Sequence, residues 1–378
     1  MPSLLIHRAR CIATQDDAQT ELQDASLLIR DGRIERIIPA SESTEALLTQ
    51  VDEVIDARHH VVVPGLINTH HHMYQSLTRA IPGVQNAELF SWLQGLYPIW
   101  VGLTPEMVRV SGQEAMAELL LSGCTTSSDH LYIYPNGVRL DDSIEAAHTI
   151  GMRFTATRGS MSVGQSQGGL PPDAAVEQEP AILKETQRLI ETWHDPARFA
   201  MQRIVVAPCS PFSVSRELMR DAALLASEYG VSLHTHLAEN DNDIAYSRER
   251  FGLTPAQYAE DLGWVGPDVW HAHCVKLDDA GISLFAASRT GVGDMRELIE
   301  GVRYRPVSAR YKVYIIDEVH MLSTAAFNAL LKTLEERLAH VIFIFATTEL
   351  SRVPETIQSR CPTFHLKKMP TKLIAQQL

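Results

Sequence analysis

Apolar and polar positions along the chain follow two different periods. Over residues 1–60, short apolar runs alternate with turns, and Asp31-Gly32 separates two of these runs, Ala25–Ile29 and Ile34–Ile38. An Asp-Gly pair between apolar runs favours a β-hairpin, because both residues tolerate the left-handed backbone of a tight turn. The opening of the chain therefore predicts a small antiparallel β unit.

From Val61 onward the pattern changes to strands of the buried type separated by helical segments. Stretches with a 3.6-residue period, such as Arg216–Tyr229, lie between the strands. The six predicted strands are Val61–Asn68, Thr125–Asp129, Met152–Thr157, Arg203–Ala207, Val231–His234 and Val269–Ala272. Repeated βα units predict a parallel sheet covered by helices, and six of them indicate an incomplete (β/α)8 barrel of the TIM type.

Histidines gather where these predicted strands end. The first strand ends in His70–His72, the second in Asp129-His130, the fifth in His234–Glu239 and the sixth in His271–Cys274. In barrel enzymes the chemistry collects at the C-terminal ends of the strands. Packing alone does not explain histidine at four strand ends, so the pattern indicates a functional site.

The spacing of these histidines suits one divalent metal, zinc or iron. His70 and His72 lie two apart on a strand and point the same way, and His236 supplies a third imidazole. Three neutral nitrogen ligands leave a position open for water, as catalytic zinc sites require. Glu239 is then placed to take a proton from that water, and His273 to hydrogen-bond the substrate or the water from the opposite wall.

Other polar residues at the same strand ends have two readings. Gln75 and Arg158 are candidates for binding a heterocycle's carbonyl or ring nitrogen, and the alternative is that they brace loops. A lone His-x-His pair is more often incidental than metal-binding; the later histidines and Glu239 favour the site. Six neighbouring histidines are interpreted as surface or supporting groups: His59, His60, His71, His130, His234 and His271.

Composition places the chain in the cytoplasm. No apolar run approaches the length that spans a bilayer, and the first ten residues lack the pattern of a secretory signal. The five cysteines are scattered with no C-x-x-C pair, which argues against a disulfide framework. We therefore expect reduced thiols and no membrane partner.

Charge divides the chain near residue 286. Residues 1–286 hold 20 Lys and Arg against 37 Asp and Glu, a net charge of −17, whereas residues 287–378 hold 13 against 9, a net charge of +4. Such a change indicates separate domains. We therefore predict a small β domain at 1–60, a truncated hydrolase barrel at 61–286 and a further α/β piece at 287–378.

Three motifs in the first part resemble the amidohydrolase superfamily. They are Pro64–His72, His236–Glu239 and Ala272–Cys274, and they are most similar to its branch of 8-oxoguanine deaminases and hydroxyatrazine aminohydrolases. The resemblance implies hydrolytic removal of ammonia from a purine-like or triazine ring, with the metal and proton-transfer roles given above. The family completes its site with an aspartate on an eighth strand, for which this sequence offers no counterpart.

Residues 287–378 resemble the AAA+ module of the bacterial DNA polymerase III gamma/tau subunit. Val313–Glu318 has the Walker B form, which implies that Asp317 faces Mg²⁺ and Glu318 faces the attacking water. Thr348 matches the sensor position and Arg360 an arginine finger. No G-x-x-x-x-G-K-[ST] loop occurs in the chain, so we do not expect ATP and Mg²⁺ to bind in cis.

The sequence thus predicts a metal-dependent deaminase of a small heterocycle, impaired by truncation and fused to an AAA+ fragment. Each part lacks a piece that its chemistry needs, so we interpret the join as a chimera. One alternative is a clamp-loader fragment that binds other clamp-loader subunits in DNA replication. A chain without a function of its own is the other, and homo-oligomerisation stays open.

Overall fold

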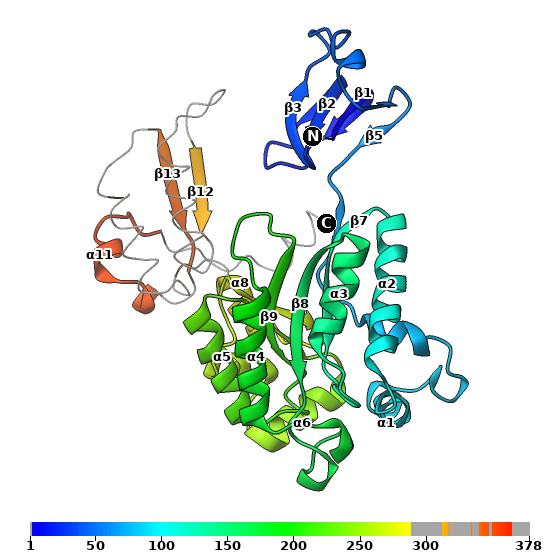
Figure 1. The fold of residues 1–378 in the computed structure, drawn as a ribbon. Helices are drawn as coiled ribbons and strands as arrows, with labels where there is room; N and C mark the ends of the chain where they lie inside the picture. Colours follow the sequence, from blue (N-terminus) through cyan, green and yellow to red (C-terminus); the bar gives the residue numbers. More distant parts are fainter. Residues whose placement is uncertain are drawn as a thin grey trace. The chain divides into compact units, whose positions relative to one another are not determined.

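The computed structural model describes residues 2–288, 312–316, 319, 334, 340–347 and 350–364 (Figure 1). The chain divides into two compact units. Unit 1 comprises Met1–Thr69 and Met116–Ser127, and unit 2 comprises His70–Ala115 and Ser128–Leu378. The predicted domain boundaries at residues 60 and 286 stay predictions.

Unit 1 is built around a five-stranded sheet. The strand order is β3-β2-β1-β4, and β5 also pairs with β1. The strands are β1 (Ser3–Ala13), β2 (Glu21–Arg30), β3 (Arg33–Ile38), β4 (Glu53–Asp56) and β5 (Val61–Val62). β2 and β3 form the predicted antiparallel hairpin, and Asp31 and Gly32 at its turn have φ angles of 50° and 70°. One core cluster contains Ala9, Ile12 and Leu27.

The prediction of one strand over Val61–Asn68 is wrong. Val61 and Val62 pair with Cys11 and Ile12 of β1, and a separate strand, β6 (Leu66–Asn68), pairs with the start of β7. Pro64 lies between the two strands. Proline has no amide hydrogen for a sheet ladder, so the chain changes partners there.

A six-stranded parallel sheet carries the residues of the predicted site. Its order is β11-β10-β9-β8-β7-β6, in which strands consecutive in sequence are neighbours in space. Beyond β6 the strands are β7 (Cys124–Leu131), β8 (Arg153–Ser160), β9 (Gln202–Pro208), β10 (Leu233–Leu237) and β11 (Val269–His273). This curled half-barrel confirms the predicted incomplete α/β barrel of the TIM type.

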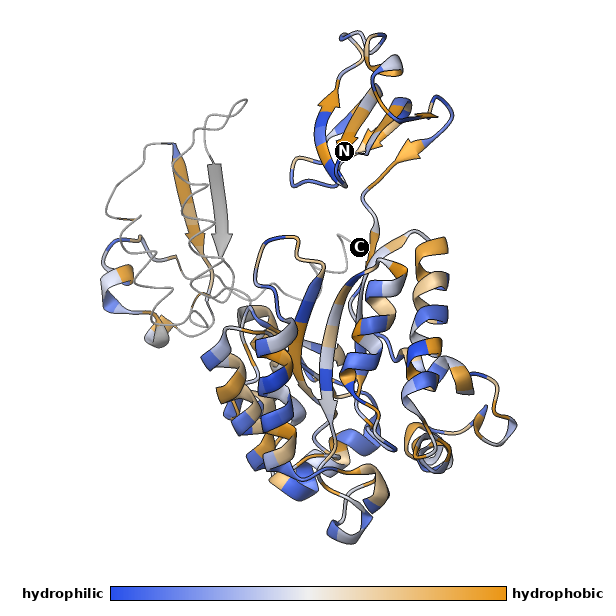
Figure 2. Cartoon of the chain, viewed as in Figure 1, coloured by the Kyte–Doolittle hydropathy of each residue, from blue (hydrophilic) through white to orange (hydrophobic). Residues whose placement is uncertain are grey.

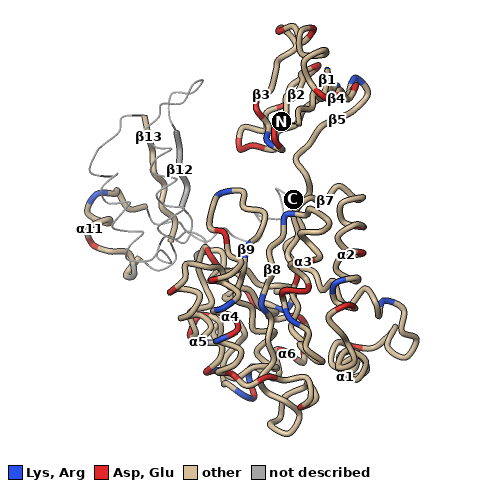
Figure 3. Tube along the Cα trace, in the orientation of Figure 1, with Lys and Arg blue, Asp and Glu red and all other residues tan. Residues whose placement is uncertain are grey.

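Helices of unit 2 cover the sheet with their apolar faces. α3 (Leu140–Ile150) packs on β8, and α4 (Glu179–Trp193) and α5 (Arg216–Tyr229) pack on β9. α5 buries Leu218 and Met219, begins at the Ser215 cap and ends at a left-handed Gly230. Both α4 and α5 mix apolar and polar residues (Figure 2). Acidic residues are spread over α4, α5 and α6 (Figure 3).

The remaining helices are α1 (Leu89–Trp100), α2 (Pro105–Leu121), α6 (Asp241–Phe251), α7 (Pro255–Asp261), α8 (Asp279–Ser288) and α11 (Glu355–Gln358). Short 3-10 helices occupy Leu47–Thr49, Met73–Thr78, Pro82–Val84, Gln165–Gln167, Asp173–Ala175 and Leu350–Arg352. Among the helices described, none has the length and apolar character needed to cross a bilayer.

Two described strands fall within the C-terminal piece. β12 (Lys312–Ile316) and β13 (Val341–Phe345) pair in parallel, as the predicted α/β pattern requires. Asp317, Glu318 and Thr348, the predicted ATPase-like residues, lie outside the described residues. Arg360, the fourth, is exposed, and its Nη1 donates a hydrogen bond to the Thr356 carbonyl at 2.6 Å.

Candidate metal centre

A cavity of about 490 Å³ lies in unit 2 where the parallel strands end. Its lining includes every residue predicted to hold metal or transfer protons: His70, His72, His236, Glu239 and His273. Gln75 also lines the cavity, whereas Arg158 does not. The structure therefore brings together groups from three separate segments of the chain.

His72 and His236 face each other through their Nε2 atoms, which lie 3.0 Å apart. Nδ1 of His72 donates to the His130 carbonyl at 2.7 Å, and Nδ1 of His236 donates to the Cys209 carbonyl at 2.6 Å. Because a carbonyl only accepts, each neutral ring carries its proton on Nδ1. Both Nε2 atoms therefore present lone pairs to the same point, and a shared cation relieves their repulsion.

His70 has the same tautomer, set by a longer chain of bonds. His234 donates from Nδ1 to the Trp270 carbonyl at 2.9 Å, so its Nε2 must accept. That acceptor lies 2.8 Å from Nδ1 of His70, which therefore carries the proton. Nε2 of His70 is left with a lone pair, as a metal ligand requires.

The three rings fit one ion. The ring centroid of His70 lies 4.7 Å from that of His72 and 4.8 Å from that of His236. Two imidazole nitrogens on one tetrahedral zinc are about 3.4 Å apart, close to the separation of the two facing Nε2 atoms. The nitrogen set is therefore the one that a divalent zinc-type ion prefers.

Burial keeps these imidazoles neutral. Burial first, and then the neighbouring His273 and His71 rings, lowers the pKa of His70 to about 4. The same two causes, burial and adjacent imidazoles, lower the pKa values of His72 and His236 well below their usual range. All three side chains are therefore unprotonated near pH 7, and no proton competes with the metal.

His234 has the supporting role predicted from the sequence, and His130 is in addition a candidate ligand. His130 is fully buried, and a ligand atom of its ring lies within 4.8 Å of those of His70, His72 and His236. Its Nε2 donates to the Ala207 carbonyl at 2.8 Å, which leaves a lone pair on Nδ1. His234 fixes the tautomer of His70. The sequence does contain a signal for His234: residues 234 and 236 lie two apart on β10, so their side chains point to the same face.

Glu239 and His273 adjoin the three imidazoles. Oε2 of Glu239 lies 3.4 Å from Nε2 of His273. Burial, followed by the charge of Asp243, raises the pKa of Glu239 to about 7. The backbone is left-handed at Ala238, His273 and Cys274, with φ of 51°, 72° and 56°. Such conformations are costly for residues with a Cβ and cluster at functional sites.

Gln75 stands against two buried phenols. Its Nε2 donates to the hydroxyl of Tyr74 at 3.3 Å and to that of Tyr132 at 3.2 Å. Trp92 and Phe212 add aromatic surface to the lining. The wall therefore combines flat apolar surface with one oriented amide, which suits a planar ring.

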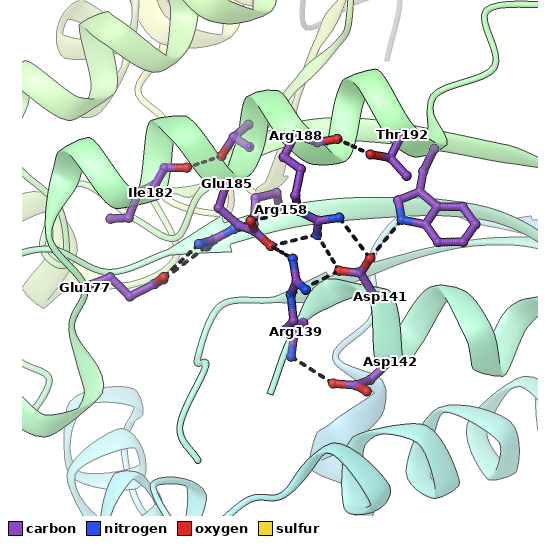
Figure 4. Close-up of polar contacts among 11 residues, drawn as sticks. Arg139, Asp141, Asp142, Arg158, Glu177, Ile182, Glu185, Arg188 and Thr192 are labelled. Atoms are coloured by element: carbon purple, nitrogen blue, oxygen red, sulfur yellow. Dashed lines mark hydrogen bonds and ion pairs between the residues drawn. The ribbon is translucent and has the colours of Figure 1, made fainter. Parts of the chain in front are cut away.

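Arg158 is not among the residues that line the cavity, which favours the alternative that it braces a loop. Figure 4 shows its contact with Glu177. Its guanidinium makes two hydrogen bonds to the Glu177 carboxylate, at 2.8 and 3.1 Å. The carbon Cζ lies 4.0 Å from the ring centre of Tyr134. The Arg158 side chain is 1% exposed, and these contacts join it to the loop before α4.

Removing Glu177 tests this bracing. We expect Glu177→Ala to lower the free energy of unfolding by about 2–4 kcal/mol, because it leaves a buried guanidinium without its counter-charge. Urea unfolding measures the change. The exposed Glu228 gives a matched control, and Glu228→Ala should stay within about 0.5 kcal/mol of the parent. Equal effects of both substitutions would contradict a bracing role.

Several known proteins are similar to this chain in sequence. A model of the Amidohydrolase family matches residues 61–339, past the barrel end predicted at residue 286. The chain is 44% identical to 8-oxoguanine deaminase of Pseudomonas aeruginosa over 269 residues, covering 70% of this chain and 59% of that protein. It is 38% identical to hydroxydechloroatrazine ethylaminohydrolase of a Pseudomonas species over 290 residues, covering 74% and 60%.

A solved structure is similar as well. A mutant of atrazine chlorohydrolase from Arthrobacter aurescens TC1, complexed with zinc and atraton, superimposes with a TM-score of 0.69 at 33% identity. The match covers 75% of this chain and 64% of that one. The chain spans about 60% of the length of the curated relatives named above.

Proposed function

Because this chain belongs to the amidohydrolase family, we propose that it derives from a metal-dependent deaminase that releases ammonia from a purine-like or related nitrogen heterocycle. One divalent metal, zinc or iron, is the cofactor of this proposal, held by His70, His72 and His236. The observation that carries it is the shared tautomer of these imidazoles, which aims three Nε2 lone pairs into one cavity.

The metal would supply Lewis acidity and lower the pKa of the attacking water. Glu239 takes a proton from that water and delivers it to the leaving amino group as the carbon–nitrogen bond breaks. A pKa near 7 suits both halves of this transfer, because the group must first accept and then donate. His273 lies beside Glu239 and is positioned to hydrogen-bond the reacting group.

The lining of the cavity supports a flat, uncharged substrate. Tyr97, Tyr132, Trp92 and Phe212 supply aromatic surface, and Gln75 supplies an oriented amide. The names of the relatives support the same class, since they describe deaminases or hydrolases of oxopurine and triazine rings. We assign Arg158 to bracing the loop before α4 through Glu177, and not to substrate binding.

Phosphorylated substrates should be rejected. Arg79 is the sole Lys or Arg in the described lining, and it faces Glu114 at 3.8 Å. A nucleoside monophosphate would bring two negative charges into the cavity, where Arg79, already paired with Glu114, is the one cationic side chain of the described lining. We expect kcat/KM for the free base to exceed that for its monophosphate by about 10³-fold or more. Comparable values would show that the substrate class is wrong.

Metal content and ammonia release together test the proposed function. The purified chain, loaded with zinc or iron, should hold about one ion per chain and release ammonia from 8-oxoguanine or a hydroxytriazine. A chain that binds no ion, or that binds it and releases no ammonia from either ring, would rule out this function for the chain as it stands.

The clamp-loader resemblance of residues 287–378 gives the second candidate function. This candidate rests on the sequence resemblance, and the described structure adds only that β12, which ends directly before Asp317, pairs in parallel with β13. Association with clamp-loader subunits in a pull-down would support it. Sequencing the source DNA across the codons for residues 280–300 tests the chimera, because one continuous gene would weaken the idea of a recombination or assembly join.

A further inference from the structure

A buried carboxylate closes the turn that presents Glu239. The turn joins β10 to α6, and it contains Ala238 in the left-handed conformation, with φ of 51°. The amide of Glu239 donates to Oδ2 of Asp243 at 3.1 Å. A second bond runs from the amide of Asp243 to Oδ1 of Asn240, at 3.0 Å. Side chains therefore hold the turn at two points.

Asp243 is an unusual residue to bury at this place. It is 1% exposed, and its Oδ1 has no hydrogen-bond partner within the part of the chain that the structure describes. A buried carboxylate with an unfilled acceptor destabilises a protein unless another function retains it. Its charge also opposes ionisation of Glu239, so attraction between the two side chains does not explain its position.

We infer that Asp243 is a positioning residue, whose carboxylate holds the left-handed turn at Ala238 and Glu239 so that the Glu239 side chain faces His273 and the cavity. This inference rests on the proposed function for its catalytic consequence. The geometry of the turn itself is independent of that function. Without the acceptor, Ala238 relaxes toward the right-handed region that a residue with a Cβ prefers, and Glu239 swings away from its place.

Hydrogen exchange of the whole chain, followed by mass spectrometry of peptides covering residues 236–243, tests the turn directly. We expect the Glu239 amide to exchange at least about tenfold faster in Asp243→Ala than in the parent chain, because the substitution removes its acceptor. Asp241→Ala is the matched control, since Asp241 is 85% exposed and in the same first turn of α6. Unchanged exchange in Asp243→Ala would overturn the inference.

Kinetics of ammonia release by the zinc-loaded chain tests the consequence. Asp243→Ala should lower kcat about 10–100-fold with KM and metal content unchanged, because a misplaced catalytic group loses rate before it loses binding. Asp243→Asn keeps an acceptor oxygen and should stay within about threefold of the parent. An Asn variant as impaired as the Ala variant would show that charge matters and would contradict positioning through the hydrogen bond.

A glycine rescue separates positioning from general damage. Glycine adopts the left-handed conformation without strain, so Ala238→Gly combined with Asp243→Ala should recover most of the lost kcat. No recovery would contradict the inference. Asp243→Leu, which keeps the side-chain volume, replaces Asp243→Ala if the latter does not fold. If the parent chain releases no ammonia, the proposed function fails, and the exchange rates alone decide the inference.

Discussion

Glu239→Gln should lower kcat for ammonia release by about 10²–10⁴-fold and leave the metal content of the chain unchanged. The amide keeps the shape of the side chain but cannot take a proton from the attacking water or return one to the leaving amine. The proposed metal ligands are three histidines, and Glu239 is not among them. The chain should therefore still bind metal. Steady-state ammonia release and metal analysis of the same preparations measure the two effects.

Glu249→Gln is the control for this substitution, because Glu249 is an exposed residue of α6 and is not among the residues that line the cavity. We expect it to match the parent in kcat and in metal content. A Glu239→Gln chain within threefold of the parent would place the proton transfer on another group, and His273 would then be the first to examine.

His236→Ala should abolish stable metal binding. The substitution removes one of the three imidazoles that would share the ion, and it opens the β10 end of the histidine cluster. We expect bound metal after dialysis to fall from about one ion per chain to below about 0.1, with kcat/KM lost in proportion. Metal analysis after extensive dialysis against metal-free buffer measures the loss.

His59→Ala is the matched control for His236→Ala. His59 is exposed, so its removal takes away an imidazole without altering the cluster. It should keep its metal and its activity. Retention of a full equivalent of metal by His236→Ala would mean that the ion binds elsewhere, and the ligand assignment would be wrong.

The sequence predicted which side chains line the cavity better than it predicted the contacts that support them. Alternation along a strand is enough to place His70 and His72 on one face, and the spacing from His236 to Glu239 fits a turn at a strand end. The structure brings these residues to one cavity. The assignment of roles to them stays a prediction, because geometry without turnover does not test a role.

Long-range contacts account for what the sequence could not predict. Arg158 ends a predicted strand, as a substrate-binding residue would, but its partner Glu177 comes from a loop whose path is not encoded in local pattern. The support of His70 by His234 depends on the Trp270 carbonyl of the next strand. The partner change at Pro64 depends on β1, more than fifty residues earlier in the chain.

X-ray absorption at the metal edge of the zinc-loaded chain tests the central claim most directly. We predict nitrogen ligands at about 2.0–2.1 Å, with the imidazole multiple-scattering pattern and no sulfur in the first shell. His236→Ala should erase that pattern. Sulfur scattering at about 2.3 Å, from Cys209 or Cys274, or a shell of water oxygens alone would contradict a site made by His70, His72 and His236.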